Sequence, residues 1–437
     1  MKVKATKVLL TAYAVNPFKG SEDGTGWNII FELAKHQKIL AITRKNNQTA
    51  IEQYLAVQDI DVSENLNFAY FDLPYWMRWW KKGERGALLY FYLWQIGVVF
   101  FIWQKQFKFE IAHHLNFHSD WMPSFLWVFG KPFVWGPIGH HPEIPKAYAV
   151  AVGGKKSYYL DQLKSLAKRW FWKYDPFLKL TKWKADKIIT INSSVLKVLN
   201  FATDKEIRLP AVASRKEKKP ASKSKSKYFI ILSIGRFVSL KGFDLVIRSF
   251  AQFYHDQSFQ DQATLQLCLI GKGPMKDSLQ ALAVQLKVSE AVVFKSWMPR
   301  AALDQYFERS SLFFFASHEG AGMVVPEALS FGLPVLCFDN IGPGEMIDET
   351  CGWKIPYSNP AKSVQQFSKK LNFIFANQMH QTAFARQARA HYEKYFTWER
   401  KGLLLSKTYE ELLVNKSCQS ATEVDPTFSL PLAKYVE

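Results

Sequence analysis

The feature that most constrains this 437-residue chain is a rhythm of short apolar runs that alternate with longer segments of helical periodicity. The first half shows it from "KVLLTAYAV" (7–15) through "GWNIIFELAKHQ" and "KILAITR" to "KPFVWGPIG" (131–139). Such alternation is typical of βαβ units, in which each helix returns the chain to a parallel sheet. We therefore expect a first α/β domain whose opening apolar run, residues 8–15, forms a buried strand.

A basic tract interrupts this rhythm. Residues 215–227, "RKEKKPASKSKSK", hold seven Lys or Arg against one Glu and offer no apolar face to bury, which is typical of a solvated linker. The rhythm restarts after it with the apolar runs 228–235, 265–271, 291–297 and 311–317. The sequence thus predicts two doubly wound, Rossmann-like α/β domains that face each other across a cleft. The expected parts are a first α/β domain (1–210), a basic linker (211–227), a second α/β domain (228–400), and a C-terminal helix and tail (401–437) that packs on the first domain.

Charge and cysteine content limit the partners and the compartment. The formal charge of +19 favours polyanions: nucleic acid, anionic lipid or phosphorylated small molecules. The four cysteines lie far apart without any metal-ligand spacing, so neither a disulfide framework nor a zinc site is expected, and a reducing cytoplasm fits. The N-terminus imitates a signal peptide, but "NPFKGSEDG" stands where a small-residue cleavage site would be.

Two neighbouring segments raise the question of a membrane. The apolar run Leu88 to Trp103 contains Gln95 and falls short of the roughly 20 residues that a spanning helix needs, so no transmembrane segment is predicted. Just before it, "YWMRWWKK" (75–82) interleaves three tryptophans with three cations. Tryptophan favours the lipid interface and cations favour anionic headgroups, so we hypothesise peripheral docking on the inner face of the plasma membrane. The alternative is that the apolar run is a helix buried against the domain's own sheet.

A glycine-rich turn with two cations follows the first strand of the second half. In "SIGRFVSLKG", Gly235 and Arg236 come directly after the strand, and Lys241 precedes the next helix. Glycines let backbone N–H groups approach an anion, and the two side chains add full positive charges. The turn is therefore either a diphosphate cradle or a solvated connection. The turn "LIGKGP", with Gly271 and Gly273, repeats the pattern after the next strand.

Two glutamates flank another glycine-rich turn, "SHEGAGMVVPEALSFGLPV" (317–335). Glu327 falls in the first turn of an expected helix, where a carboxylate complements the helix dipole. Glu319 precedes that helix and has no such role. Carboxylates accept paired hydrogen bonds from vicinal hydroxyls, so a ligand that carries both a diphosphate and a sugar would satisfy cations and anions together.

Segments from both halves of the sequence resemble those of a known protein family. "GRFVSLKG", "LIGKGP", "SHEGAGMVVPEALSFGLPVL" and "GPGEMI" together resemble the C-terminal domain of family-4 retaining glycosyltransferases (group 1) of the GT-B fold, with their E-x7-E motif. "NPFKGSEDGTGW", "AHHLNFHSDWMPSFLW" and "WGPIG" resemble the acceptor domain of bacterial members. The resemblance implies transfer of a hexose from a nucleotide-diphosphate sugar to a saccharide or lipid-linked acceptor. It places the enzyme in surface polysaccharide or glycolipid biosynthesis.

The resemblance also implies roles for individual residues. Arg236 and Lys241 would hold the donor diphosphate, Glu319 would bond hydroxyls of the transferred sugar, and Glu327 would bond the ribose. Further donor contacts would come from the backbone of Gly322, Met323 and Val324 and from a glycine loop with Gly24 and Gly26. Ala321 stands where the family usually has Phe, a departure that leaves the turn intact.

Histidines supply the remaining candidates. His113 and His114 end the strand "FEIAHH", and the resemblance implies that one of them faces the reacting carbon; which one stays open. His118, with Asp120, follows on a loop as an acceptor contact or a solvated pair. His140, like His141 beside it, contacts the acceptor or lies at the surface.

No cofactor or metal is implied beyond the donor substrate, because cationic side chains would stabilise the leaving phosphate. The pair Asp59 and Asp61 in "VQDIDVSEN" is interpreted as a turn rather than a metal site.

Two other classes of function remain open. One is a different sugar-nucleotide enzyme on the same fold, such as an epimerase or phosphorylase. The other is a basic nucleic-acid-binding protein, for which no RRM, helix-turn-helix or zinc signature is present, so no nucleic-acid partner is expected.

Overall fold

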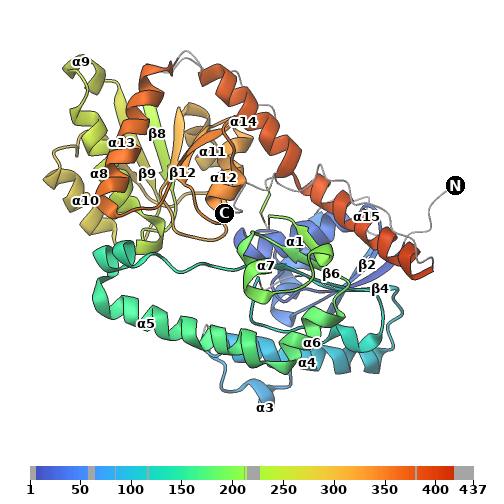
Figure 1. Ribbon diagram of the computed structural model, residues 1–437. Helices are drawn as coiled ribbons and strands as arrows, with labels where there is room; N and C mark the ends of the chain where they lie inside the picture. The colour runs from blue at the N-terminus through green and yellow to red at the C-terminus, as the bar shows by residue number, and fades with distance from the viewer. Residues whose placement is uncertain are drawn as a thin grey trace. The chain divides into compact units, whose positions relative to one another are not determined.

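The computed structural model describes residues 6–57, 64–83, 85–115, 118–210, 212–213, 227–378 and 381–417. The chain forms two compact α/β units, each built on one parallel sheet (Figure 1), which confirms the predicted fold class. The first unit comprises residues 1–140, 166–212 and 398–437, and the second comprises residues 141–165 and 213–397. The pair Asp59 and Asp61, residues 214–226 of the expected linker and residues 418–437 of the tail lie outside the described residues.

The first unit has a seven-stranded sheet in the order β3-β2-β1-β4-β5-β6-β7. Its first apolar run is the buried central strand β1, as predicted, because apolar residues occupy both faces of that strand. The strands are β1 (Lys7–Thr11), β2 (Lys38–Thr43), β3 (Leu66–Tyr70), β4 (Ile111–His114), β5 (Phe133–Ile138), β6 (Lys187–Thr190) and β7 (Glu206–Arg208).

Helices cover both faces of this sheet (Figure 1). On one face, α4 and α6 join a single apolar core with the strands. On the other, α15 packs against α1 so closely that a Cβ on Gly402 would lie 2.7 Å from the Cβ of Glu32. The helices are α1 (Ser21–Ala34), α2 (Gln48–Val57), α3 (Tyr75–Arg78), α4 (Ala87–Lys105), α6 (Pro176–Lys184), α7 (Ser194–Leu199) and α15 (Trp398–Ser417), with short 3-10 turns at Lys45–Asn47, Leu126–Phe129 and Thr203–Lys205.

The longest helix, α5 (Lys146–Tyr174), passes from the second unit to the first and is broken at Gly154, where φ is 72°. The expected contiguous first domain, 1–210, therefore differs from the observed units, since residues 141–165 belong to the second. The physical reason is Tyr148, which is buried in the core of the second unit. Its hydroxyl lies 2.7 Å from Ser363 Oγ and accepts a hydrogen bond from the Ser358 amide.

The second unit has a six-stranded sheet in the order β10-β9-β8-β11-β12-β13. The four apolar runs that follow the basic tract form β8 to β11, as predicted. The elements are β8 (Phe229–Ile234), α8 (Phe243–His255), α9 (Phe259–Gln262), β9 (Leu265–Ile270), α10 (Lys276–Gln285), β10 (Val292–Lys295), α11 (Arg300–Arg309), β11 (Leu312–Phe315), α12 (Val324–Ser330), β12 (Val335–Phe338), β13 (Gly352–Ile355), α13 (Pro360–Ala376) and α14 (Gln381–Tyr395), with 3-10 turns η4 (Ser239–Lys241) and η5 (Pro343–Met346).

The long apolar run forms helix α4, and its 19 residues make it long and apolar enough to cross a membrane. The helix has three residues more than the run, since Ala87 precedes the run and Gln104 and Lys105 follow it. That no segment spans a membrane stays a prediction. Length and composition are a weak criterion, since core helices of soluble proteins also meet it. One face of α4, with Tyr90, Phe91 and Trp94, is buried in the core of the first unit.

Candidate functional site

The predicted donor residues gather at the point in the second sheet where the strand order reverses. From β8 the chain proceeds outward to β9 and β10, and β11 then returns to the other side of β8. The loops that leave two adjacent parallel strands diverge at such a switch point, which is where ligands of open α/β sheets bind. The turn with Arg236 and Lys241 follows β8, and the turn with Glu319 follows β11.

The structure brings Lys241 and Glu319 into direct contact. The Lys241 Nζ lies 2.5 Å from Glu319 Oε2, and the two side chains are only 13% and 14% exposed. A backbone hydrogen bond joins the two turns, because the His318 amide donates to the Leu240 carbonyl. Gly242 permits this approach: its φ is 63°, and a Cβ there would lie 2.1 Å from the Ala316 carbonyl oxygen.

The second carboxylate oxygen of Glu319 is available to a ligand. Glu319 Oε1 is buried and has no hydrogen-bond partner among the described residues. A buried acceptor without a donor is costly, and a ligand hydroxyl placed there would satisfy it. The Lys241 ammonium has three donors, so its bond to Glu319 leaves others for an anion.

Arg236 is the second cation of this turn and is exposed where β8 ends. It forms no ion pair with any residue in the described part of the chain. An exposed guanidinium next to a polar cluster is suited to bidentate binding of a phosphate. The site can therefore hold an anion and hydroxyl groups side by side.

The glycines that follow β8 and β9 serve close packing of two turns. A Cβ on Gly271 would lie 1.9 Å from the Gly235 carbonyl oxygen, and one on Gly273 would lie 2.5 Å from the Phe237 oxygen. The Phe237 amide also donates to the Lys272 carbonyl at 2.9 Å. Only glycine allows this backbone approach. Contact of these glycines with a ligand stays a prediction.

The remaining donor candidates lie at the start of α12. Helix α12 begins at Val324 with Met323 as its N-cap residue, and Glu327 lies half-buried one turn later. Gly322 precedes them with a φ of 61°, and a Cβ there would lie 2.9 Å from Pro343 Cγ of the "GPGEMI" segment. The ribose contact of Glu327 stays a prediction.

Two further histidines belong to this site: His318 was not among the predicted residues, and His141 was expected either to contact the acceptor or to lie at the surface. His318, directly before Glu319, stacks on Phe338 and Tyr357, and burial lowers its pKa to about 4, so that the ring is neutral. His141 Nδ1 accepts a hydrogen bond from the Gly320 amide at 3.3 Å. Its place in the sequence, 179 residues before Gly320, offers no signal of this contact.

In the first unit, the expected glycine loop is a helix. Helix α1 begins at Ser21, so Gly24 and Gly26 lie inside it and are buried. Acidic Glu22 and Asp23 in the first turn favour this helix start. A Cβ on Gly24 would lie 2.4 Å from the Lys19 carbonyl oxygen, so packing against the preceding chain explains that glycine.

The two adjacent histidines at the end of β4 differ in their surroundings. His113 is fully buried; its Nε2 donates to the Gly136 carbonyl at 2.7 Å and its Nδ1 accepts from the Tyr409 hydroxyl at 2.6 Å. Burial lowers the pKa of His113 to about 4, so the ring stays neutral and links β4, β5 and α15. His114 pairs with Thr11 across the switch point of the first sheet and packs its ring on Phe91. With both nitrogens of His113 bonded inside the fold, His114 becomes the better candidate for the active-site histidine.

The other two histidine candidates of this unit, His118 and His140, form hydrogen bonds with the protein. His140 Nδ1 donates to Asp120 Oδ2 at 2.6 Å, and the Asp120 side chain is only 5% exposed. His118 joins the same region through its backbone, because its amide donates to Glu22 and its carbonyl accepts from Gly139. The expectation of a solvated His118 and Asp120 pair is therefore wrong: Asp120 pairs with His140.

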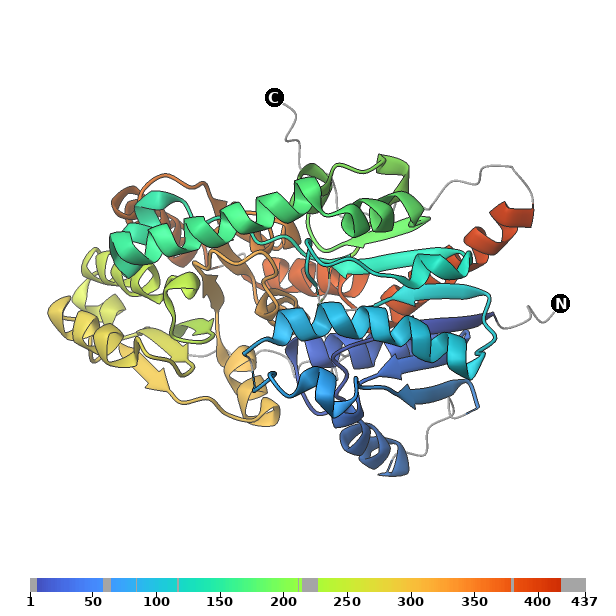
Figure 2. The same ribbon diagram turned by 90° about the horizontal axis from the view of Figure 1, so that it is seen from below.

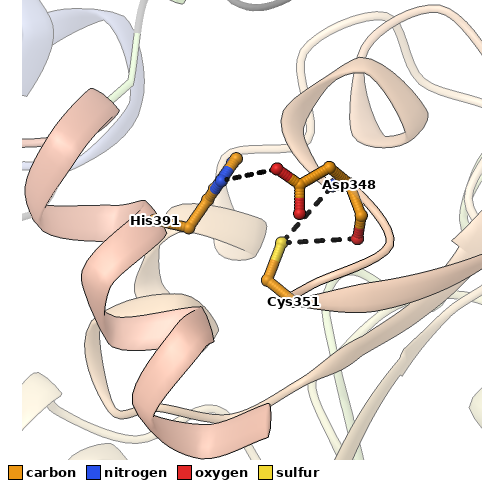
Figure 3. A group of neighbouring side chains, drawn as sticks. All are labelled: Asp348, Cys351 and His391. Atoms are coloured by element: carbon orange, nitrogen blue, oxygen red, sulfur yellow. Dashed lines mark hydrogen bonds and ion pairs between the residues drawn. The ribbon is translucent and has the colours of Figure 1, made fainter.

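A cluster of three titratable side chains, Asp348, Cys351 and His391, lies away from the donor site (Figure 3). His391 Nε2 lies 3.0 Å from the Met346 carbonyl oxygen, and its Nδ1 lies 3.2 Å from Asp348 Oδ2. This contact holds the pKa of Asp348 below its usual range, and burial raises the pKa of the Cys351 thiol to about 12. The thiol bonds the backbone of Asp348, so each group has a partner and a metal is not needed to explain the cluster.

Comparison with known proteins gives matches in sequence and in structure. Residues 214–391 match the family described as glycosyl transferases group 1. An uncharacterized glycosyltransferase of Haemophilus influenzae is 31% identical over 166 residues, covering 36% of this chain and 43% of the relative. The lipopolysaccharide core biosynthesis glycosyltransferase LpsE of Rhizobium meliloti is 34% identical over 118 residues, covering 26% of this chain and 31% of the relative. The chain thus spans less than half of the length of these curated relatives.

The structural match extends much further. The crystal structure of HepE from Anabaena in complex with UDP superposes with a TM-score of 0.62, covering 93% of this chain and 100% of that chain at 15% identity. At this identity the likeness shows the fold alone. It extends to both units, so the pair of α/β domains that makes up the GT-B fold is present in this chain.

Proposed function

We propose, from the match of residues 214–391 to the glycosyl transferases of group 1, that the chain belongs to this family and is a retaining hexosyltransferase. It transfers a sugar from a nucleotide-diphosphate donor. The observation that carries the proposal is the Lys241–Glu319 pair, in which a buried carboxylate oxygen that has no hydrogen-bond partner in the described part of the chain lies beside an ammonium group. A diphosphate sugar satisfies both parts of the site, since its phosphates bind the cationic side chains and its hydroxyls donate hydrogen bonds to the carboxylate.

The same residues supply the chemistry of transfer. Cleavage of the donor places negative charge on the departing phosphate, and Arg236 and Lys241 stabilise that charge as it develops. The departing phosphate then accepts the acceptor proton on the same face of the sugar, which retains the anomeric configuration. Glu319 orients the sugar. His114, from the first unit, orients or stabilises the reacting carbon without acting as a nucleophile.

We extend the proposal to the acceptor and the location. The acceptor is a saccharide or lipid-linked saccharide of surface polysaccharide or glycolipid assembly, and the enzyme works at the inner face of the plasma membrane. Support comes from LpsE, a relative whose name places it in lipopolysaccharide core biosynthesis. Support for the donor class comes from the structural neighbour that was solved with UDP.

The test measures donor consumption by the full chain with a set of UDP-sugars and other nucleotide sugars, each with and without a panel of saccharide and lipid-linked acceptors. We expect release of nucleoside diphosphate that requires an acceptor, with the product anomer matching the donor by NMR. The Glu319→Gln variant serves as control. It keeps the size of the side chain but weakens its hydrogen bonds to the sugar, so it should release nucleoside diphosphate more slowly. Conversion of the donor sugar without any acceptor would instead favour an epimerase or another sugar-nucleotide enzyme.

A further inference from the structure

The first unit exposes large apolar side chains on one of its faces. They come from α3, α4, the last nine residues of α5 (166–174) and α6, which share the side of the sheet that Figure 2 turns toward the viewer. We call this surface the α3–α6 face; its exposed apolar residues are Tyr75, Trp76, Trp79, Leu88, Leu89, Phe100, Trp103, Leu166, Trp170, Tyr174, Phe177 and Trp183. Burial inside the unit therefore does not account for them.

The burial pattern of α4 separates this face from the core. The side chains of Trp94 and Val98 are buried, whereas Phe100 is 62% and Trp103 is 74% exposed. In α5, Leu166, Trp170 and Tyr174 recur every four residues and so lie along one side of the helix, all exposed. Exposed apolar residues clustered in this way on neighbouring elements mark an interaction surface.

The charge of the α3–α6 face identifies the kind of partner. Its four segments, 75–82, 87–105, 166–174 and 176–184, hold ten Lys or Arg and no Asp or Glu. Five of the fifteen tryptophans in the chain are exposed on this face. Cations lie beside aromatic rings, as where Lys184 Nζ is 4.3 Å from the ring centre of Trp183. Tryptophan and tyrosine with interspersed cations are the composition that favours the headgroup region of an anionic bilayer.

We propose that the α3–α6 face docks on an anionic lipid bilayer, with α5 and α6 contributing as much of the contact as α3 and α4. The tryptophan side chains insert into the headgroup region, and the Lys and Arg side chains form ion pairs with the surrounding anionic lipids. The absence of acids from the four segments favours a uniformly negative surface over a protein partner of mixed charge. This inference rests on the proposed location of the transferase and names the surface responsible for it.

The experiment is flotation of the full chain with vesicles of equal parts phosphatidylethanolamine and phosphatidylglycerol, compared with pure phosphatidylcholine vesicles, at moderate salt. Wild type should float with the anionic vesicles only. The double variant Trp170→Ser and Trp183→Ser should lose this binding, whereas the control Phe259→Ser and Val284→Ser, exposed apolar residues of the second unit, should keep it. All four substituted side chains are exposed, so the variants should fold alike, which circular dichroism checks.

A second pair of variants tests the charges. Lys173→Gln with Lys184→Gln should weaken binding about 25-fold, or about fivefold for each cation, while Lys362→Gln with Lys369→Gln in the second unit should leave it unchanged. Wild-type protein that stays in the soluble fraction, or α5 and α6 variants that float as well as wild type, would overturn the proposal. Nucleoside diphosphate binding, measured on the same variants, should be unaffected. If the wild-type protein does not bind nucleoside diphosphate, that result counts against the proposed transferase and not against the docking surface.

Discussion

The ion pair between Lys241 and Glu319 gives the most specific prediction about the candidate donor site. Lys241→Met removes the cation but keeps much of the side-chain volume, and it leaves Glu319 as an uncompensated charge with both oxygens unpaired. Loss of one partner from a buried pair costs roughly 3 to 5 kcal/mol. Because the two side chains remain 13% and 14% exposed, we expect the lower end, about 3 kcal/mol. For a unit of this size that corresponds to a fall in Tm of roughly 6 to 12 °C.

Thermal unfolding of a double-mutant cycle checks this reasoning. The double variant Lys241→Met with Glu319→Gln has no charge left to bury, so it should recover most of the stability that the single variant loses. Calorimetry with free nucleoside diphosphate adds a second readout, since Lys241→Met should also remove a charge-assisted bond worth about 1.5 to 3 kcal/mol to the ligand. A single variant as stable as wild type, or a double variant no more stable than the single one, would refute the claim that the pair is electrostatically coupled.

Three further predictions concern separate residues. Arg236→Ala should weaken binding of free nucleoside diphosphate at least tenfold by calorimetry, because it removes a charge-assisted hydrogen bond, and an unchanged affinity would contradict the anion site. Glu319→Gln should lower turnover while leaving nucleotide affinity nearly intact, whereas Glu327→Ala should weaken the nucleotide itself; equal losses in both would favour a helix-capping role for Glu327. The His391 contact lowers the pKa of Asp348 below its usual 3.8, so the carboxylate adds stability above about pH 4 that is lost as the pH falls further. The Tm difference between wild type and Asp348→Asn should therefore shrink below about pH 4, and a constant difference from about pH 6 to pH 3 would count against the ion pair.

The sequence by itself determined the two α/β sheets and the turns that carry the donor residues. Strand and helix periodicities are local properties, so the apolar runs that follow the basic tract mark β8 to β11 without knowledge of any distant contact. The same holds for the turns with Arg236 and Glu319, because a residue that directly follows a strand of a parallel sheet lies at its carboxyl edge.

The tertiary structure decided which of these residues meet and which are occupied elsewhere. Lys241 and Glu319 are 78 residues apart, and only the neighbouring positions of β8 and β11 place them in contact. His113 is bonded to Tyr409, 296 residues away on α15, and this contact takes it out of the set of free catalytic groups. Tyr148 likewise assigns residues 141–165 to the second unit through its bond to Ser363. Periodicity reports which face of an element is apolar, but the partner of each side chain depends on packing between distant segments, which no local pattern encodes.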